Sequence, residues 1–282
     1  MTPRAALAVV WDFDTAVGQV NATYPYHFRP APLEEELAAV AELEQVSVRL
    51  GLTMTFATVG LAAEDLDGPF GAGDELRNVH AAGHEVASHS WRHEWLPHLT
   101  TQQVRRSLVR SKLALERRIG APRAVEGFVP PFNRPMTWLA RGEVHPGDRW
   151  AVPPAAGATL DSLIPAVAGA GYRWIRAGYG RRWGRARGDR LWPPEQVGGC
   201  TNLPLHHNGF DRPAHDLLDE ALARRRLVVL GGHPAGLFRH GEEHRDLVVG
   251  LLEAAARRRD AGDLDVITMG QAAARARGGG PR

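Results

Sequence analysis

The sequence has one cysteine, few aromatic residues and no long apolar run. Cys200 alone can form no disulfide within the chain, and it excludes a metal site built from several thiolates. No stretch approaches the roughly 20 apolar residues that a membrane-spanning helix needs. The short apolar run from Ala5 to Trp11 leads straight into two aspartates, which favours a strand over the apolar segment of a signal peptide. We therefore expect a cytoplasmic protein with no membrane span.

The sequence also has no large excess of positive or negative charge. The formal net charge is +2 over 282 residues, and the arginine clusters mostly interrupt helix-like segments, where solvated helix faces are the ordinary explanation. Nucleic acid is therefore not an expected partner. The length and an ordinary hydrophobic fraction of 44% predict a single α/β domain over residues 1–282.

Apolar runs of strand length alternate with segments of helical spacing along most of the chain. The first is a strand at 5–14; after an expected loop at 15–32, a helix at 33–50 and a strand at 52–59 follow. About seven such strands, with no internal repeat, predict a parallel, barrel-like α/β fold. Residues 177–201 are rich in Arg, Trp and Gly and are predicted to be an irregular insertion that sets substrate selectivity.

Two pairs of polar residues follow predicted strands. His89 and His93 lie four residues apart, so a helical turn or a tight loop would bring their imidazoles together. Asp12 and Asp14 end the first strand, where two carboxylates on one face repel each other unless a cation or a shared proton lies between them. One aspartate with two histidines would leave a position for water, which is the pattern of catalytic zinc. The alternatives are surface histidines spaced by chance and an aspartate that caps a turn.

Four short motifs extend this pattern along the chain. They read WDFD at 11–14, HSWRH at 89–93, VPPFN at 129–133 and LGGH at 230–233. Their order is similar to that in the NodB-homology polysaccharide deacetylases (carbohydrate esterase family four), which implies a distorted (β/α)7-type barrel. All four follow predicted strands, so they would gather at one rim of that barrel.

The resemblance implies a role for each motif. Asp14, His89 and His93 would bind one divalent metal ion, with zinc preferred and cobalt, nickel, manganese or iron as alternatives. Asp12 would act as the general base and His233 as the general acid. The backbone N–H near Phe132 would form part of an oxyanion hole, on a backbone that two prolines restrain.

The chain departs from the family pattern at several positions. Phe13 separates two aspartates that are usually adjacent, and Val129 and Phe132 replace the arginine and tyrosine of the third motif. The family's D-x-x-D-W motif has no clear counterpart, since Asp148-Arg149-Trp150 is a poor match. Because the family's arginine holds the base, we predict that Asp12 is held by another group or has a higher pKa.

These features together predict a hydrolase that removes an acetyl or formyl group from nitrogen. The expected substrate is an amino sugar or a sugar-containing biosynthetic intermediate, either small or carrier-linked, and the oligomeric state stays open. Two alternatives remain: a hydrolase of C–N bonds in linear amides or ureides, and a catalytically inactive sugar-binding barrel. The residues predicted to contact substrate are Tyr26, Pro131, Asn133, Trp183 and His206.

Overall fold

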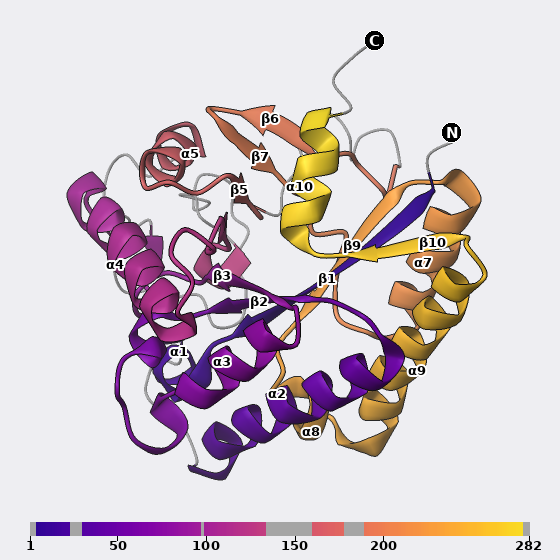
Figure 1. Cartoon of the computed structure of the whole chain (residues 1–282), viewed down its shortest axis with the longest axis horizontal. Coiled ribbons are helices and arrows are strands. Elements are labelled where there is room, and N and C mark those ends of the chain that lie inside the picture. Colours follow the sequence, from indigo (N-terminus) through magenta and orange to yellow (C-terminus); the bar gives the residue numbers. More distant parts are fainter. Residues whose placement is uncertain (1–3, 23–29, 97–98, 134–159, 178–188, 279–282) are drawn as a thin grey trace, which may run out of the picture.

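A computed structural model of the chain describes residues 4–22, 30–96, 99–133, 160–177 and 189–278 (Figure 1). Strands occupy the centre of the molecule and helices lie around them. Within the described ranges, no helix combines the length and the apolar character needed to cross a membrane.

The strands form one curled sheet in the order β6-β7-β5-β4-β3-β2-β1-β9-β8, and β10 also pairs with β1. Every pair is parallel except β6 with β7. This is the barrel-like α/β arrangement that the alternating sequence pattern predicts. The strands are β1 Ala5–Phe13, β2 Thr55–Thr58, β3 Glu85–Ser88, β4 Gly127–Phe128, β5 Trp174–Ile175, β6 Glu195–Val197, β7 Cys200–Asn202, β8 His207–Asn208, β9 Leu227–Gly232 and β10 Leu264–Ile267.

Helices connect most of the parallel strands and cover the outside of the sheet (Figure 1). Helix α4, Thr101–Ile119, begins with a capping box that Thr100 forms with Gln103. The α-helices are α1 Thr15–Ala22, α2 Pro30–Leu50, α3 Gly73–Ala81, α4 Thr101–Ile119, α5 Leu160–Gly169, α7 Arg212–Arg224, α8 Gly236–Arg239, α9 Gly241–Asp260 and α10 Met269–Gly278, with short 3-10 turns at η1 Gly60–Ala63, η2 Gly68–Phe70 and η4 Pro131–Asn133.

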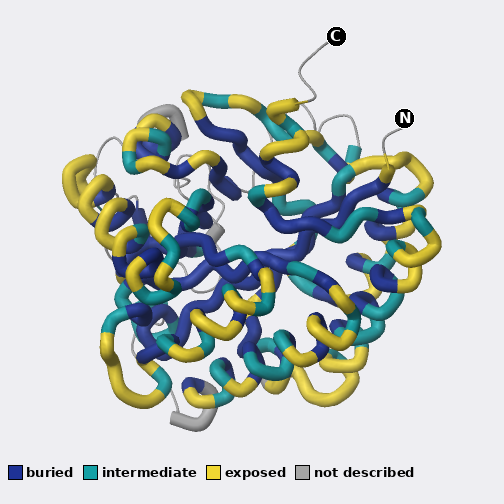
Figure 2. The backbone as a smooth tube through the Cα atoms, in the orientation of Figure 1, coloured by how far each residue is buried: buried dark blue, intermediate teal, exposed yellow. Residues whose placement is uncertain are grey.

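Strand β1 is buried along its whole length (Figure 2). Its side chains belong alternately to two apolar clusters. Its larger side chains, at alternate positions from Leu7 to Phe13, pack in the cluster that includes the helices. The smaller ones between them, from Ala6 to Val10, face the barrel interior together with residues of α10. Because strand side chains alternate, Asp12 continues the interior series and points into the barrel.

Two segments differ from the sequence expectations. Residues 15–22 form helix α1, although the segment 15–32 was expected to be a loop; Thr15 begins it with a φ of 54° and accepts a hydrogen bond from the Val17 N–H at 3.2 Å. The predicted insertion at 177–201 is not irregular throughout, because β6 and β7 form a hairpin within it. Gly198 and Gly199 both have positive φ, as a tight hairpin turn requires.

Candidate active site

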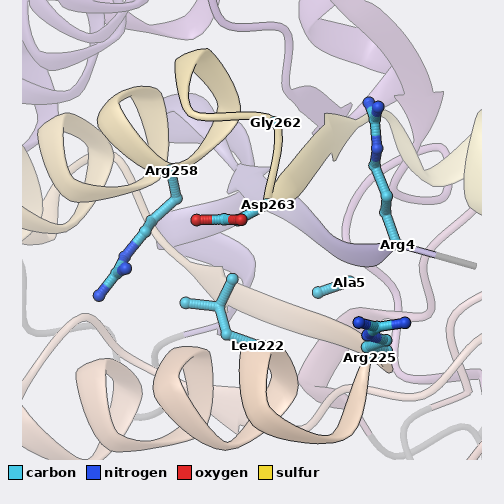
Figure 3. A pocket seen from close by; sticks show the side chains of 7 residues that line it. All are labelled: Arg4, Ala5, Leu222, Arg225, Arg258, Gly262 and Asp263. Atoms are coloured by element: carbon cyan, nitrogen blue, oxygen red, sulfur yellow. The ribbon is translucent and has the colours of Figure 1, made fainter.

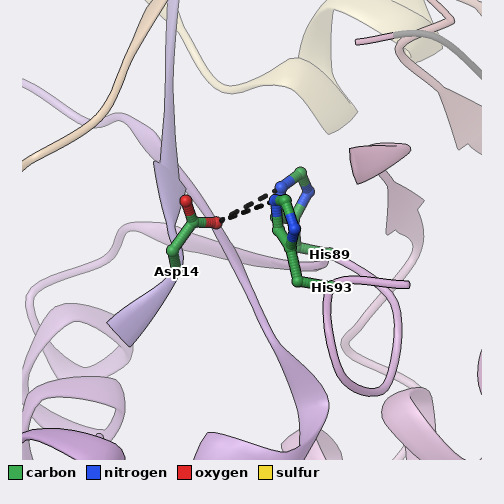
Figure 4. Close-up of side chains that lie close together, drawn as sticks. All are labelled: Asp14, His89 and His93. Carbon is green, nitrogen blue, oxygen red and sulfur yellow. Dashed lines mark ion pairs between the residues drawn. The ribbon is translucent and has the colours of Figure 1, made fainter. Parts of the chain in front are cut away.

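Three side chains from two strand ends converge at one rim of the barrel (Figure 4). Asp14 follows β1, and His89 and His93 follow β3. Asp14 Oδ1 lies 3.4 Å from His89 Nε2 and 3.5 Å from His93 Nε2. All three residues are buried, and their ligand atoms lie within 4.8 Å of one another. The structure therefore brings together the carboxylate and the two imidazoles that the sequence spacing singled out.

A tight turn, rather than a helix, places the two histidines. Ser90 and His93 both have positive φ, at 66° and 58°. The turn is tied to η1 because the Gly60 N–H donates to the Ser90 carbonyl at 2.8 Å. It is also tied to α4, since the Trp91 N–H donates to Ser107 Oγ at 2.9 Å. These bonds hold both imidazoles on the side that faces Asp14.

The geometry of the three residues fits a divalent cation. In tetrahedral zinc sites with metal–ligand distances near 2.0–2.1 Å, neighbouring ligand atoms lie about 3.3 Å apart, close to the distances seen here. His89 Nδ1 bonds to the Val129 carbonyl at 2.8 Å, which leaves Nε2 directed at Asp14. That Nε2 is buried and has no hydrogen-bond partner among the described residues.

Burial keeps both imidazoles neutral, which is the form that binds a metal ion. Burial lowers the pKa of His89 to about 4, and it lowers the pKa of His93 well below the ordinary value. A metal ligand must be a neutral imidazole, so neither histidine has to lose a proton at neutral pH before binding a cation.

Asp12 lies beside this triad but has a different partner. Its Oδ2 accepts a hydrogen bond from Arg176 Nη2 at 2.7 Å, and both side chains are buried. Burial alone would raise the pKa of Asp12, but the Arg176 charge, with smaller contributions from His89 and His233, lowers it to about 2. The prediction that another group holds Asp12 thus agrees with the structure, whereas the higher pKa offered as the alternative is wrong.

Arg176 is the residue of the site that the sequence analysis did not identify. It directly follows β5 and makes the ion pair with Asp12 that Val129, an apolar residue buried in the barrel interior, cannot make. Gly231 of β9 leaves room for the guanidinium, since a Cβ there would lie 3.1 Å from Arg176 Nη1. The sequence feature that could have pointed to Arg176 is its position immediately after a short apolar strand.

His233 completes the group from a third strand end. It follows Gly231 and Gly232 of β9, and its Nε2 lies 3.7 Å from Asp14 Oδ2. Its side chain is 45% exposed, so it does not point into the core. A Cβ at Gly232 would come within 2.8 Å of the Phe210 ring, which explains the need for glycine before His233.

The third motif places a strained backbone against the triad. Phe132 has a φ of 63° and a ψ of 9°, an uncommon conformation for a residue with a side chain. Its ring meets the His93 imidazole edge-on, with 4.6 Å between the ring centroids. The preceding Pro131 is buried. The predicted oxyanion donor therefore belongs to a backbone segment in contact with one of the candidate ligands.

The other predicted substrate residues have different outcomes. Tyr26 and Trp183 lie outside the described residues, as does the side chain of Asn133. The ring of His206 is used inside the protein: its Nδ1 accepts from the Val229 N–H at 2.8 Å and its Nε2 bonds to the Trp192 carbonyl at 2.9 Å. With both nitrogens engaged, His206 holds β9 in place and has no ring nitrogen left to bond to a substrate.

A pocket of about 370 Å³ lies at the opposite end of the barrel (Figure 3). It adjoins Arg4 and Ala5 at the start of β1, whereas Asp14 follows the end of this nine-residue strand, about 30 Å away. Arg4 and Arg258 extend away from each other, and Asp263 lies between them (Figure 3). Since the charges do not converge, this pocket is not a candidate active site.

Comparisons with known proteins agree with this fold. Residues 38–137 match the family model for polysaccharide deacetylases. The chain matches no curated protein sequence at a significant level. The family-model match and the structures described next confirm the resemblance that the four motifs indicated.

Three solved structures are similar over nearly the whole chain. A crystal structure from Mycobacterium smegmatis, described as a polysaccharide deacetylase, gives a TM-score of 0.71 at 18% identity and covers 99% of this chain and 92% of its own. A family 4 carbohydrate esterase from Streptomyces lividans, in complex with acetate, gives 0.50 at 14% identity, over 94% and 93%. A family 4 pseudoenzyme from Bacillus anthracis gives 0.53 at 10% identity, over 95% and 65%. At these identities the structures show a shared fold, and the case for chemistry rests on the site residues.

Proposed function

We propose that this chain, which has the NodB fold of the polysaccharide deacetylases, is a metal-dependent hydrolase that removes an acetyl or formyl group from the nitrogen of an amino sugar or a sugar-containing intermediate. One observation carries the proposal. Asp14, His89 and His93 converge on one point, and an ion-paired carboxylate and a half-exposed histidine flank them. This combination supplies a metal site, a base and an acid within one rim.

Asp14, His89 and His93 would hold one divalent cation. Two imidazoles and one carboxylate suit zinc first, and they also accept cobalt, nickel, manganese or iron. When bound, such a cation polarises a substrate carbonyl and lowers the pKa of a coordinated water. The carbonyl of Val129 fixes the tautomer of His89 for this task.

Asp12 would act as the general base. Arg176 keeps its carboxylate ionised and fixes the orientation of Oδ2. The other oxygen, Oδ1, has no hydrogen-bond partner among the described residues. That oxygen would accept the proton of the attacking water while a new C–O bond forms at the acyl carbon.

His233 would act as the general acid at the other side of the scissile bond. As the C–N bond breaks, its imidazolium would donate a proton to the departing amine nitrogen. The backbone N–H near Phe132 would stabilise the charge that develops on the carbonyl oxygen. The proton that Asp12 receives and the proton that His233 gives balance the hydrolysis to a carboxylic acid and an amine.

Two rival functions use the same observations differently. A hydrolase of linear amides or ureides would need the same metal, base and acid, and would differ only in the substrate that binds at the rim. A catalytically inactive sugar-binding barrel would need the fold alone, and a pseudoenzyme of this fold exists. The chain has the three candidate metal ligands, Asp12 as a candidate base and His233 as a candidate acid. The presence of all five groups favours an enzyme over a binding protein.

The first experiment is a metal analysis of the purified protein joined to assays on a panel of N-acetyl and N-formyl amino sugars. We expect one bound divalent metal per chain and turnover of at least one sugar. Asp12→Asn should lower kcat by about 10²–10⁴-fold and keep the metal, because it removes the base without removing a ligand. Asp14→Asn should lose the metal as well as the activity.

The exposed carboxylate Asp65, which pairs with Arg118, provides the matched control: Asp65→Asn should change neither metal content nor turnover. Turnover of ureides with none of the sugars would favour the first rival. Metal-free protein with no turnover on either panel would favour the inactive barrel.

A further inference from the structure

A second pocket, of about 230 Å³, adjoins the candidate active site and is not explained by it. Its lining includes His233 but none of the three candidate metal ligands. It is built from the segment after β8, the end of β9, helix α8 and the start of α9. We call it the His233 pocket; it is lined by Trp11, Asn208, Gly209, Phe210, Gly232, His233, Gly236, Leu237, His240, His244 and Val248.

The inner wall of the His233 pocket is apolar and closely packed. The rings of Trp11 and Phe210 stack at 4.5 Å with an interplanar angle of 22°, and both are buried. A Cβ at Gly232 would lie 2.8 Å from one of these rings and 3.4 Å from the other, so the wall has no room to collapse inward. The pocket is therefore a fixed hollow beside the general acid.

Two imidazoles converge at the outer side of the pocket. His240 and His244 are one helical turn apart, with ring centroids 5.0 Å from each other. Both Nε2 atoms lie 3.9 Å from the point where a Cβ of Gly236 would be. Both rings therefore border the same space beside Gly236.

The surroundings of this imidazole pair suit an anion better than a metal. A tightly held cation needs at least three protein ligands, and the one group of three metal-ligating side chains found among the described residues is the triad at Asp14. No acidic residue lines the pocket. The nearby Asp211 is bonded to His207 Nε2 at 2.7 Å.

Helix α9 begins directly after His240, and its first turn carries Glu242 and Glu243. Because these carboxylates already complement the helix dipole, the helix end adds nothing to the preference for an anion. That preference rests on the two imidazoles and on the absence of acidic side chains from the lining.

We propose that the His233 pocket binds an anionic substituent, a carboxylate or a phosphate, on the amine side of the N-acyl substrate, and that His240 and His244 are its ligands. This inference rests on the proposed function, because His233 gives its proton to the departing amine. The part of the substrate attached to that nitrogen then lies next to His233, where the pocket begins. The bound anion would determine which amines the enzyme releases.

The test compares matched neutral and anionic substrates on the metal-loaded protein. Suitable pairs are N-acetylglucosamine with its 6-phosphate, and N-acetyl-β-alaninamide with N-acetyl-β-alanine. We expect kcat/KM to be about 10- to 100-fold higher for at least one anionic member, the range expected for hydrogen bonds to a charged group. The double variant His240→Gln/His244→Gln should lose that preference, and the two pairs distinguish a phosphate from a carboxylate.

His80→Gln, on helix α3, is the matched control and should keep the full preference. Equal kcat/KM for both members of each pair in the wild type, or a preference that survives the double variant, would overturn the proposal.

A binding measurement separates this inference from the proposed function. Inorganic phosphate, or acetate as the carboxylate probe, is titrated against the NMR signals of the His240 and His244 rings, assigned through the single variants. Saturable shifts of both signals would support the pocket even if no N-acyl substrate turned over. Absence of shifts with both probes would refute it, whatever the enzyme assays show.

Discussion

Asp12 and Asp14 are two residues apart, yet their carboxylates have different surroundings. Asp12 faces a guanidinium, whereas Asp14 faces three imidazoles. The first is therefore held ionised by a permanent charge, and the second lies against the neutral rings of His89 and His93. At the scale of single residues, this difference separates the base from the metal ligand.

Arg176→Gln should change the pH dependence of the reaction. Without the guanidinium, burial raises the pKa of Asp12, so the acidic limb of the kcat/KM profile should move up by about 1–3 pH units. The variant also leaves a buried carboxylate without its cation, which should lower the free energy of unfolding by about 3–5 kcal/mol. The profile is measured from pH 2.5 to 9, because the Asp12 limb starts from a pKa of about 2 in the wild type, and the stability is measured by urea unfolding.

Two further variants control this prediction. Arg176→Lys keeps a positive charge and should restore part of the profile. Arg173→Gln removes an arginine that is 65% exposed and paired with Glu126, and should leave the acidic limb where it is. An unchanged limb in Arg176→Gln would show that Asp12 is not the group that titrates.

At the scale of elements, the site depends on how close β9 lies to its neighbours. Gly231 would place a Cβ 2.8 Å from Leu205 Cδ1 and 3.4 Å from the Val10 carbonyl oxygen, in addition to its contact with Arg176. Gly231→Ala should therefore lower the free energy of unfolding by about 1–3 kcal/mol through overpacking. Because the methyl group displaces Arg176, the acidic limb of the pH profile should also rise.

Gly250→Ala is the matched control for that change. It lies inside helix α9, and a Cβ there meets nothing within 4 Å. It should raise the free energy of unfolding by about 0.5–1 kcal/mol, because alanine is the better helix former. If both variants had the same effect in urea unfolding, the argument from close packing would be wrong.

The sequence predicted the elements with strong periodicity and the residues at their ends. The apolar run before Asp12 and the spacing of His89 and His93 were sufficient to predict that these residues lie together, because strand ends of a parallel sheet meet at one rim. Arg176 could not be assigned, since its partner is 164 residues away in the chain and only the order of strands brings the two together. The β6–β7 hairpin was missed because its strands are three residues long and carry no alternating pattern.

At the scale of the whole molecule, buried histidines make stability depend on pH. His84 accepts a hydrogen bond from the Met54 N–H at 3.0 Å and bonds to Ser47 Oγ at 2.9 Å, and burial lowers its pKa to about 4. His206 is also shifted to about 4, again by burial first. The folded chain keeps both rings neutral, whereas the unfolded chain protonates them near pH 6.5.

The unfolded state therefore binds more protons between pH 6.5 and 4. The stabilisation is fully present above pH 6.5 and is lost as the pH falls toward 4, by as much as about 3 kcal/mol for each histidine. Urea unfolding at pH 7.5, 6.0 and 5.0 checks this. The destabilisation caused by His84→Gln should be largest at pH 7.5 and shrink at pH 5.0, and a cost independent of pH would contradict the assignment.

Strand β1 pairs with β9 along one edge, and with β10 and β2 along the other. It is translated before β9 and β10, which follow residue 226. Throughout most of synthesis this apolar strand thus exposes an edge that can pair with a neighbouring nascent chain. Efficient production of the protein should therefore depend on chaperones that shield β1 until the segment after residue 226 has emerged.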